Sequence, residues 1–213
     1  MISKRSHVRR AAAVVAAGAA ALVLAACGGN GDTDAAGGHN DSGHGAASSS
    51  PSTPAAATQG GRNAADVAFA QGMIPHHRQA VEMADLAPTR AESPAVKKLA
   101  ADIRKAQDPE IRTLSGWLTS WGEQVPAAGA ADHSAHGGGM MTVAEMDRLK
   151  AASGKAFDTS FMELMIKHHE GAVAMAKTEQ AQGAFPGAKK MAEAIITSQS
   201  AEIAQMNKLL GRS

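Results

Sequence analysis

The sequence predicts an all-α fold, a four-helix bundle built from two copies of one helical hairpin. Ala, Met, Leu, Glu, Lys and Gln dominate residues 64–211, and no alternating strand pattern appears there. A phrase with two histidines at residues 69–77 returns 92 positions later at 161–169, and the match runs on into the following helix. Each hairpin alone would expose an apolar stripe, so two hairpins packed together bury both stripes.

The first 26 residues are expected to be a lipoprotein signal peptide. A charged start precedes an apolar stretch that is too short for a comfortable membrane span. Leu24-Ala25-Ala26-Cys27 then fits the cleavage signal of bacterial lipoproteins, so Cys27 is expected to become the first residue and to carry the lipid. An ordinary secretory signal cut near Ala26, or an uncleaved anchor, is the alternative.

Residues 27–63 predict a flexible linker behind the lipidated cysteine, because Gly, Ala, Ser, Thr and Pro dominate and no periodic apolar residues occur. The folded domain is expected to occupy residues 64–213. It divides into repeat one at 64–122, a loop and short helix at 123–153, and repeat two at 154–211. Predicted helices are 64–87, 94–122, 143–152, 156–182 and 187–211.

Local signals set the expected helix ends. Pro88 is expected to end the first helix, and Thr142-Val143-Ala144-Glu145 predicts a capping box that starts the short one. Pro75 interrupts the first helical pattern where Lys167 stands in the second copy. A proline inside a helix costs about 3 kcal/mol, so either the helix begins near Pro75 or the backbone bulges there.

Composition excludes several classes of site. Removing residues 1–26 leaves 17 basic against 20 acidic residues, a formal charge of −3. With no Tyr, two Trp and four Phe, the chain lacks the basic, aromatic-rich surface of a nucleic-acid-binding protein. Cys27 is its only cysteine, so neither a disulfide nor a thiolate metal site is expected.

The repeated phrase carries the candidate chemistry. Met73 stands one helical turn before both His76 and His77, so a thioether and an imidazole from one inward face can bind the same ion. Adjacent histidines diverge by about 100°, which leaves one of each pair free for a second ion, another helix or a hydrogen bond. The candidate metal ligands are Met73, His76, His77 and Met83 in the first copy, and Met165, His168, His169 and Met175 in the second.

Ligand softness favours copper, with Cu(I) first and zinc second, because thioether sulfur binds Cu(I) well and Mg²⁺, Ca²⁺ or Fe³⁺ poorly. The structural alternative is that the methionines fill the core and the histidines hydrogen-bond within it. Asp66 and Asp158 are more simply explained as helix caps. Glu110 and Glu202 face either the site or solvent, and the histidines and methionines of residues 132–141 are either a weaker capture site or a solvated connector.

The chain resembles the bacterial domain-of-unknown-function family 305. The resemblance lies in the Met-Ile-x-His-His phrase at residues 73–77 and 165–169, and in the Gln-x-x-Glu-Ile phrase at 107–111 and 199–203. It implies a ferritin-like helical bundle and, where members have an assigned activity, periplasmic copper binding and copper tolerance through Met and His ligands. Leu114 stands where the second copy has Met206, so the two copies are not equivalent in sulfur.

Together these features predict an extracytoplasmic protein, held to the membrane through Cys27, that sequesters or hands on Cu(I). One alternative is a ferritin-like oxidase with a di-metal centre, but no Glu in the chain is followed three residues later by His. The other is a structural envelope module whose histidines only bridge helices. Whether two copies form a homodimer, and which protein would receive the metal, stay open.

Overall fold

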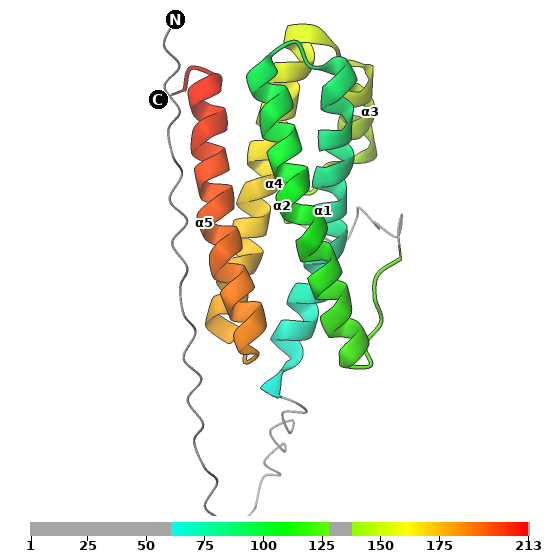
Figure 1. Cartoon of the computed structure of the whole chain (residues 1–213), viewed down its shortest axis with the longest axis vertical. Coiled ribbons are helices and arrows are strands. Elements are labelled where there is room, and N and C mark those ends of the chain that lie inside the picture. Colours follow the sequence, from blue (N-terminus) through cyan, green and yellow to red (C-terminus); the bar gives the residue numbers. More distant parts are fainter. Residues whose placement is uncertain (1–60, 128–137, 213) are drawn as a thin grey trace, which may run out of the picture. The chain divides into compact units, whose positions relative to one another are not determined.

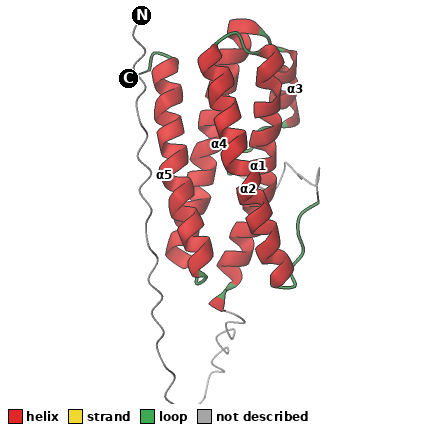
Figure 2. Cartoon of the chain, viewed as in Figure 1, coloured by secondary structure: helices red, strands yellow, loops and turns green. Residues whose placement is uncertain are grey.

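The computed structural model describes residues 61–127 and 138–212. Within these ranges the regular elements are helices: α1 (Ala64–Arg90), α2 (Pro94–Ser120), α3 (Val143–Ala151), α4 (Gly154–Gln182) and α5 (Pro186–Leu209) (Figures 1 and 2). The all-α prediction is confirmed. No helix among the described residues is long and apolar enough to cross a membrane. The expected signal peptide, Cys27 and most of the linker lie outside the described residues.

The four long helices form a bundle of two hairpins. Helix α1 packs along α2 and α4 packs along α5, and the hairpins meet chiefly through α1 and α4 (Figure 1). The short helix α3 lies against α1 and α4. Thr142 begins α3 with the predicted capping box, in which its hydroxyl accepts from the Glu145 N–H and the Glu145 carboxylate accepts from the Thr142 N–H. Because the two hairpins meet along α1 and α4, the seam between these two helices lies inside the domain.

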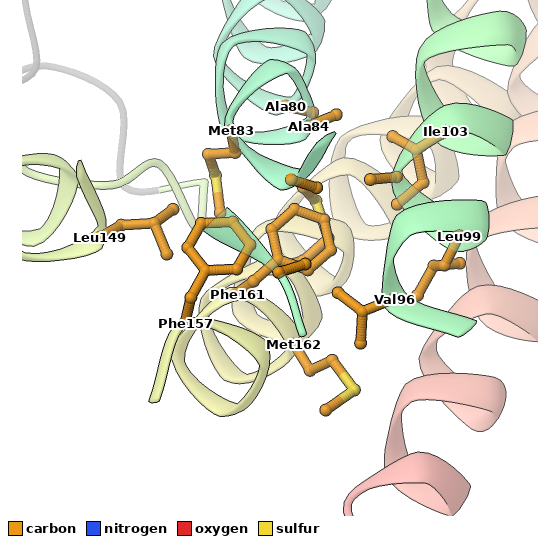
Figure 3. Close-up of a cluster of buried hydrophobic side chains, with 14 of the residues drawn as sticks. Ala80, Met83, Ala84, Val96, Leu99, Ile103, Leu149, Phe157, Phe161 and Met162 are labelled. Carbon is orange, nitrogen blue, oxygen red and sulfur yellow. The ribbon is translucent and has the colours of Figure 1, made fainter. Parts of the chain in front are cut away.

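Two clusters of buried apolar side chains fill the bundle. One contains Phe157 and Phe161 of α4 and Leu149 of α3, together with residues of α1, α2 and α5. Figure 3 shows Met83 of α1 pointing toward the two aromatic rings. The other lies around Met73, Leu114 and Leu118 at the opposite part of the bundle. The apolar stripes predicted for the two hairpins are thus buried against each other, which supplies the main driving force for folding.

The prolines do not end or interrupt the helices. Helix α1 runs through Pro75 and Pro88 to Arg90, so the predicted end before Pro88 is wrong, and α2 likewise contains Pro109. Pro88 and Pro109 are exposed and Pro75 is partly exposed, so water can reach the carbonyls that lose their amide partners. Packing of the hairpin, rather than local propensity, sets where α1 stops.

Two aspartates join the hairpins reciprocally. The Asp158 carboxylate of α4 accepts hydrogen bonds from the backbone N–H groups of Glu92 and Ser93, at 3.1 and 2.8 Å, where α2 begins. The Asp66 carboxylate of α1 accepts from Ala184 and Phe185 where α5 begins, at distances down to 2.8 Å. Asp66 also completes the capping box of its own helix, but Asp158 caps only the partner hairpin, which corrects the expectation of a local cap.

These contacts fix how the hairpins are joined. Ser93 and Phe185, the residues that precede α2 and α5, form no side-chain cap of their own, so the distant carboxylates satisfy N–H groups that would otherwise be unpaired. Because the start of α1 meets the end of α4 and the start of α4 meets the end of α1, the two central helices run antiparallel.

Glu179, near the end of α4, is a buried carboxyl next to Asp66. Only 1% of its surface is exposed, and neither of its oxygens forms a hydrogen bond of regular geometry with a described residue. Burial raises the pKa of Glu179 to about 8, helped by the contact with the Asp66 carboxyl and by its negative charge, while Lys189 opposes the rise. At Asp66 burial raises the pKa, but the hydrogen bonds outweigh it and the pKa falls below the usual value. Glu179 is therefore protonated at neutral pH beside an ionised Asp66.

This arrangement predicts a pH-dependent stability that Glu179→Gln removes. Since the folded-state pKa exceeds the unfolded value, the stabilisation is complete below about pH 4.5 and is lost as pH rises toward 8. Urea denaturation at a series of pH values should show the wild type and Glu179→Gln within about 1 kcal/mol at pH 5, and the variant more stable by about 2–5 kcal/mol at pH 9. Glu193→Gln on the exposed face of α5 is the control; parallel curves for Glu179→Gln and the wild type would contradict the assignment.

Candidate metal centre

The two histidine pairs meet in the seam between α1 and α4. The ring centroids of His76 and His168 are 3.8 Å apart, and their planes are tilted by 43°. His77 and His169 are fully buried next to them along the same two helices. The helical turn predicted to carry each Met-x-x-His-His phrase inward does so in both hairpins. The structure thus brings the four predicted histidines into one polar interior.

The two central imidazoles are neutral. Burial lowers the pKa of His76 to about 3, and the neighbouring His77 and His169 add to the shift, while the hydrogen bond to Gly138 opposes it. Burial, followed by the proximity of His76, His169 and His77, puts the pKa of His168 well below its usual value. Neutral imidazole is the form that binds metal ions, because its lone pair is not occupied by a proton.

Each outer histidine bonds to a glutamate on the second helix of its own hairpin. The His77 Nε2 lies 2.7 Å from a carboxylate oxygen of Glu110, and the His169 Nε2 lies 2.6 Å from that of Glu202. Both imidazoles are fully buried, whereas the glutamates are about one-fifth exposed. Of the two orientations open to Glu110 and Glu202 from the sequence, the structure shows the one that faces the site.

Five nitrogen atoms in this interior have no hydrogen bond of regular geometry to residues 61–127 or 138–212. They are the Nδ1 atoms of His76, His77, His168 and His169, and the Nε2 atom of His168. The Oε1 atoms of Gln107 and Gln199, one turn before the two glutamates, are buried and unpaired as well. Unsatisfied polar atoms cost free energy in a dry interior, and a cation would satisfy several of them together.

The predicted methionine ligands are divided between the two apolar clusters. Met73 is fully buried in one cluster, and the partly buried Met175 packs against it. Met83 and Met165 are fully buried in the other. Met83 points toward Phe157 and Phe161 (Figure 3), so packing accounts for its position without a metal. Met73 and Met165 stand one turn before the histidine pairs, on the same buried faces of α1 and α4.

A short segment that we call the strap, residues 138–141, crosses α1 and α4 beside the histidines. The Gly138 carbonyl accepts a hydrogen bond from the His76 Nε2 at 2.8 Å. The Gln79 side chain holds Met141 from both sides, accepting from its N–H at 2.6 Å and donating to its carbonyl at 2.9 Å. On α4, Gly171 leaves room for the strap, because a Cβ there would lie 1.6 Å from the Gly138 oxygen.

The structure of the strap answers part of the question whether residues 132–141 are a weaker capture site for metal or a solvated connector. Met141 is fully buried in the apolar core, so it is a packing residue. His133 and His136 lie outside the described residues. Gly138 and Met175 are also neighbours, since a Cβ at Gly138 would lie 3.5 Å from the Met175 sulfur. The sequence did not indicate the roles of Gln79 and Gly171, which stand 92 positions apart and differ from each other.

The side chains are not preassembled as a metal cage. Across residues 61–127 and 138–212, no group of three or more His, Asp or Glu side chains is placed to hold a metal ion. Asp66 and Asp158 are occupied at the helix ends and take no part in the seam. The available donors are therefore bare imidazole nitrogens with thioether sulfurs nearby in the chain, which is a soft donor set.

Comparison with known protein families gives one match. The model of the family described as domain of unknown function (DUF305) matches residues 66–210, which covers all but the first two residues of the helical bundle. No curated protein matches the chain in sequence.

Solved structures of similar sequence share the fold. A DUF305 protein from Streptomyces coelicolor is 34% identical, with a TM-score of 0.62 over 69% of this chain and 92% of that one. A DUF305 fragment from Deinococcus radiodurans is 32% identical, with a TM-score of 0.63 over 71% of this chain and 98% of the fragment. CopM in its Cu(I)-bound form is 36% identical, with a TM-score of 0.58 over 68% of this chain and 94% of CopM.

The seat of the strap yields a stability prediction with a matched control. Gly171→Ala should lower the free energy of unfolding by about 1–3 kcal/mol, because its methyl group would occupy the place of the Gly138 carbonyl. Gly116→Ala in the middle of α2 meets nothing within 4 Å and should raise it by about 0.5–1 kcal/mol, since alanine favours the helix. Urea denaturation measures both; equal effects of the two substitutions would show that the strap does not pack on Gly171.

Proposed function

This chain belongs to the DUF305 family, and we propose that it binds copper ions, Cu(I) in preference to Zn²⁺, and sequesters them or hands them on. The copper ion is cargo in this proposal, and the chain is a binding protein rather than an enzyme. One observation carries the proposal: the His76 and His168 rings lie in contact in a buried seam, neutral, with nitrogens that have no hydrogen-bond partner among the described residues. Solved structures of CopM with Cu(I), Cu(II) and silver bound, 36–38% identical to this chain, support it.

The donor set supports a soft ion. Imidazole nitrogens accept both oxidation states of copper, and thioether sulfur adds a preference for Cu(I) over harder ions. We assign as ligands His76, His77, His168 and His169, with Met73 and Met165 as the principal sulfur donors. Met175, beside the strap, is a further donor, and Met83 contributes least because it packs against aromatic rings.

A binding mode with few ligands fits the absence of a ready cage. Cu(I) is stable with low coordination numbers, so a pair of imidazoles, or an imidazole with a thioether, is sufficient to hold it. The repetition of the phrase in α1 and α4, which we attribute to duplication of one hairpin, places equivalent donors on both sides of the seam. Gly138, which holds His76 but not His168, makes the two sides different in detail.

The di-metal oxidase is the weaker candidate on the same residues. Such centres need several inward carboxylates with Glu-x-x-His pairs. In the described part of the chain, Glu110 and Glu202 each bond to one histidine, and Asp66 and Asp158 are used at helix ends. The two carboxylates of the seam are thus already bonded to histidines, and the chain has no Glu-x-x-His pair, which favours copper binding over a di-metal centre.

The proposed place of action is outside the cytoplasmic membrane, with the bundle held to the envelope by lipidated Cys27. The support is the lipoprotein cleavage signal at residues 24–27 and the linker that follows it. Met and His suit such an oxidising compartment, because free thiols would be oxidised there. From this position, copper binding would contribute to copper tolerance.

Removal of the sulfurs should weaken Cu(I) binding selectively. Met73→Leu with Met165→Leu approximately conserves volume and should cost less than about 1.5 kcal/mol of stability. Competition with a Cu(I) chelator under reducing conditions should show about tenfold or greater loss of Cu(I) affinity and little change for Cu(II). His76→Gln with His168→Gln should weaken the binding of both oxidation states.

The control for this experiment is Met146→Leu, a buried methionine of α3 outside the proposed site. It should leave Cu(I) affinity unchanged while altering the core to a similar extent. If the Met73 and Met165 variants stay folded and bind Cu(I) as tightly as the wild type, the sulfurs are core residues and the soft-metal proposal is wrong.

Loss of the lipidation site should release the protein from the membrane. Cys27→Ala should leave the precursor uncleaved or move the protein out of the detergent phase, because the lipid is attached at that residue. Phase partitioning and the mass of the N-terminal peptide measure the two effects, and Ser42→Ala in the linker is the control. Unaltered processing and partitioning of Cys27→Ala would exclude the anchor.

A further inference from the structure

The two glutamates that bond to the outer histidines have a role that the metal site alone does not assign. Each imidazole has two ring nitrogens, and only the one without a proton can bind a metal ion. At His77 and His169 the Nε2 faces a carboxylate oxygen, at 2.7 and 2.6 Å, while the Nδ1 is buried without a partner in the part of the chain that the structure describes. The glutamates therefore decide which nitrogen is bare.

The acceptor determines where the proton sits. An ionised carboxylate only accepts hydrogen bonds, so the Nε2 of each histidine must carry the hydrogen. The Nδ1 of each ring is buried and has no hydrogen-bond partner among residues 61–127 and 138–212. His76 follows the same rule, because its Nε2 donates to the carbonyl of Gly138. Three of the four imidazoles thus have Nε2 tied to an oxygen and Nδ1 left bare.

We infer that Glu110 and Glu202 are positioning residues, which hold His77 and His169 in the Nε2–H tautomer and make Nδ1 the metal-binding atom. The inference rests on the proposed function for the identity of the metal, but not for the tautomer. Histidines that bind metals in proteins commonly donate their other N–H to a carboxylate, and loss of that partner weakens binding by about 10- to 100-fold. Both glutamates lie at the edge of the seam, where about one-fifth of each side chain is exposed.

The tautomer can be read in the metal-free protein. In the full chain labelled with ¹⁵N-histidine, long-range ¹H–¹⁵N spectra should show Nε2 protonated and Nδ1 bare at His77 and His169. Glu110→Leu should alter the tautomer of His77 and leave His169 unchanged in the same molecule, and Glu202→Leu should do the reverse. A protonated Nδ1 at both histidines of the wild type would overturn the inference.

Addition of Ag(I) then identifies the binding atom, since one-bond coupling between silver and ¹⁵N marks the nitrogen that holds the ion. Coupling at Nδ1 of His77 and His169 supports the inference, and coupling at Nε2 overturns it. If Ag(I) and Cu(I) fail to bind while the tautomers are as stated, the proposed function is wrong and the positioning of the rings stands.

Conservative substitutions separate positioning from general stability. Glu110→Gln keeps an oxygen acceptor and should keep the tautomer and the Cu(I) affinity within about threefold, whereas Glu110→Leu should lower the affinity by about tenfold or more. Glu193→Leu, on the exposed face of α5, should change neither. If Glu110→Leu unfolds, the tautomer of His77 in Glu110→Gln and in the wild type still decides the question. Equal Cu(I) affinity in a folded Glu110→Leu would refute the positioning role.

Discussion

The packing of α1 against α4 is the constraint on which the other features depend, because it buries four imidazoles in one seam. Such burial is unfavourable for charged rings, and the central pair His76 and His168 is neutral for that reason. The outer histidines find their partners on α2 and α5, through Glu110 and Glu202. Each hairpin therefore supplies both the buried imidazole and the carboxylate that makes its burial tolerable, and the site cannot form without the correct pairing of helices.

The strap makes different contacts with α1 and α4, so the two sides of the seam are not equivalent. Gln79 and Gly171 occupy corresponding positions, yet one holds Met141 by two hydrogen bonds and the other provides the space into which Gly138 fits. Gly139 has a positive φ of 81°, which glycine adopts without strain, as the strap turns over α4. As a result His76 has one bare nitrogen and His168 has two. The two halves thus offer different numbers of donor atoms to an ion.

Side-chain directions that follow from helical periodicity could be predicted from the sequence. Contacts with residues far away in the sequence could not. The inward direction of His76 and His168 follows from spacing along one helix, whereas the orientation of Glu110 depends on how α2 is rotated against α1. The sequence around Asp158 suggested a cap of its own helix. Its carboxylate instead accepts hydrogen bonds from the N–H groups of residues 92 and 93 in the other hairpin, which local sequence does not reveal. Helix α1 continues through Pro88 to Arg90, because tertiary packing outweighs local helix propensity.

The unpaired nitrogens connect the burial of the imidazoles with the proposed selectivity for copper. Five nitrogens lie in an interior where residues 61–127 and 138–212 offer them no hydrogen bond of regular geometry, so the folded state carries a cost that the proposed bound cation would remove. An ion that binds the folded state alone stabilises it by mass action. A hard ion such as Mg²⁺ must give up strongly held water to enter the seam, whereas Cu(I) exchanges weakly held ligands for imidazole and thioether donors. In the proposed function, the buried seam therefore favours the soft ion through its donor atoms and through its burial away from solvent.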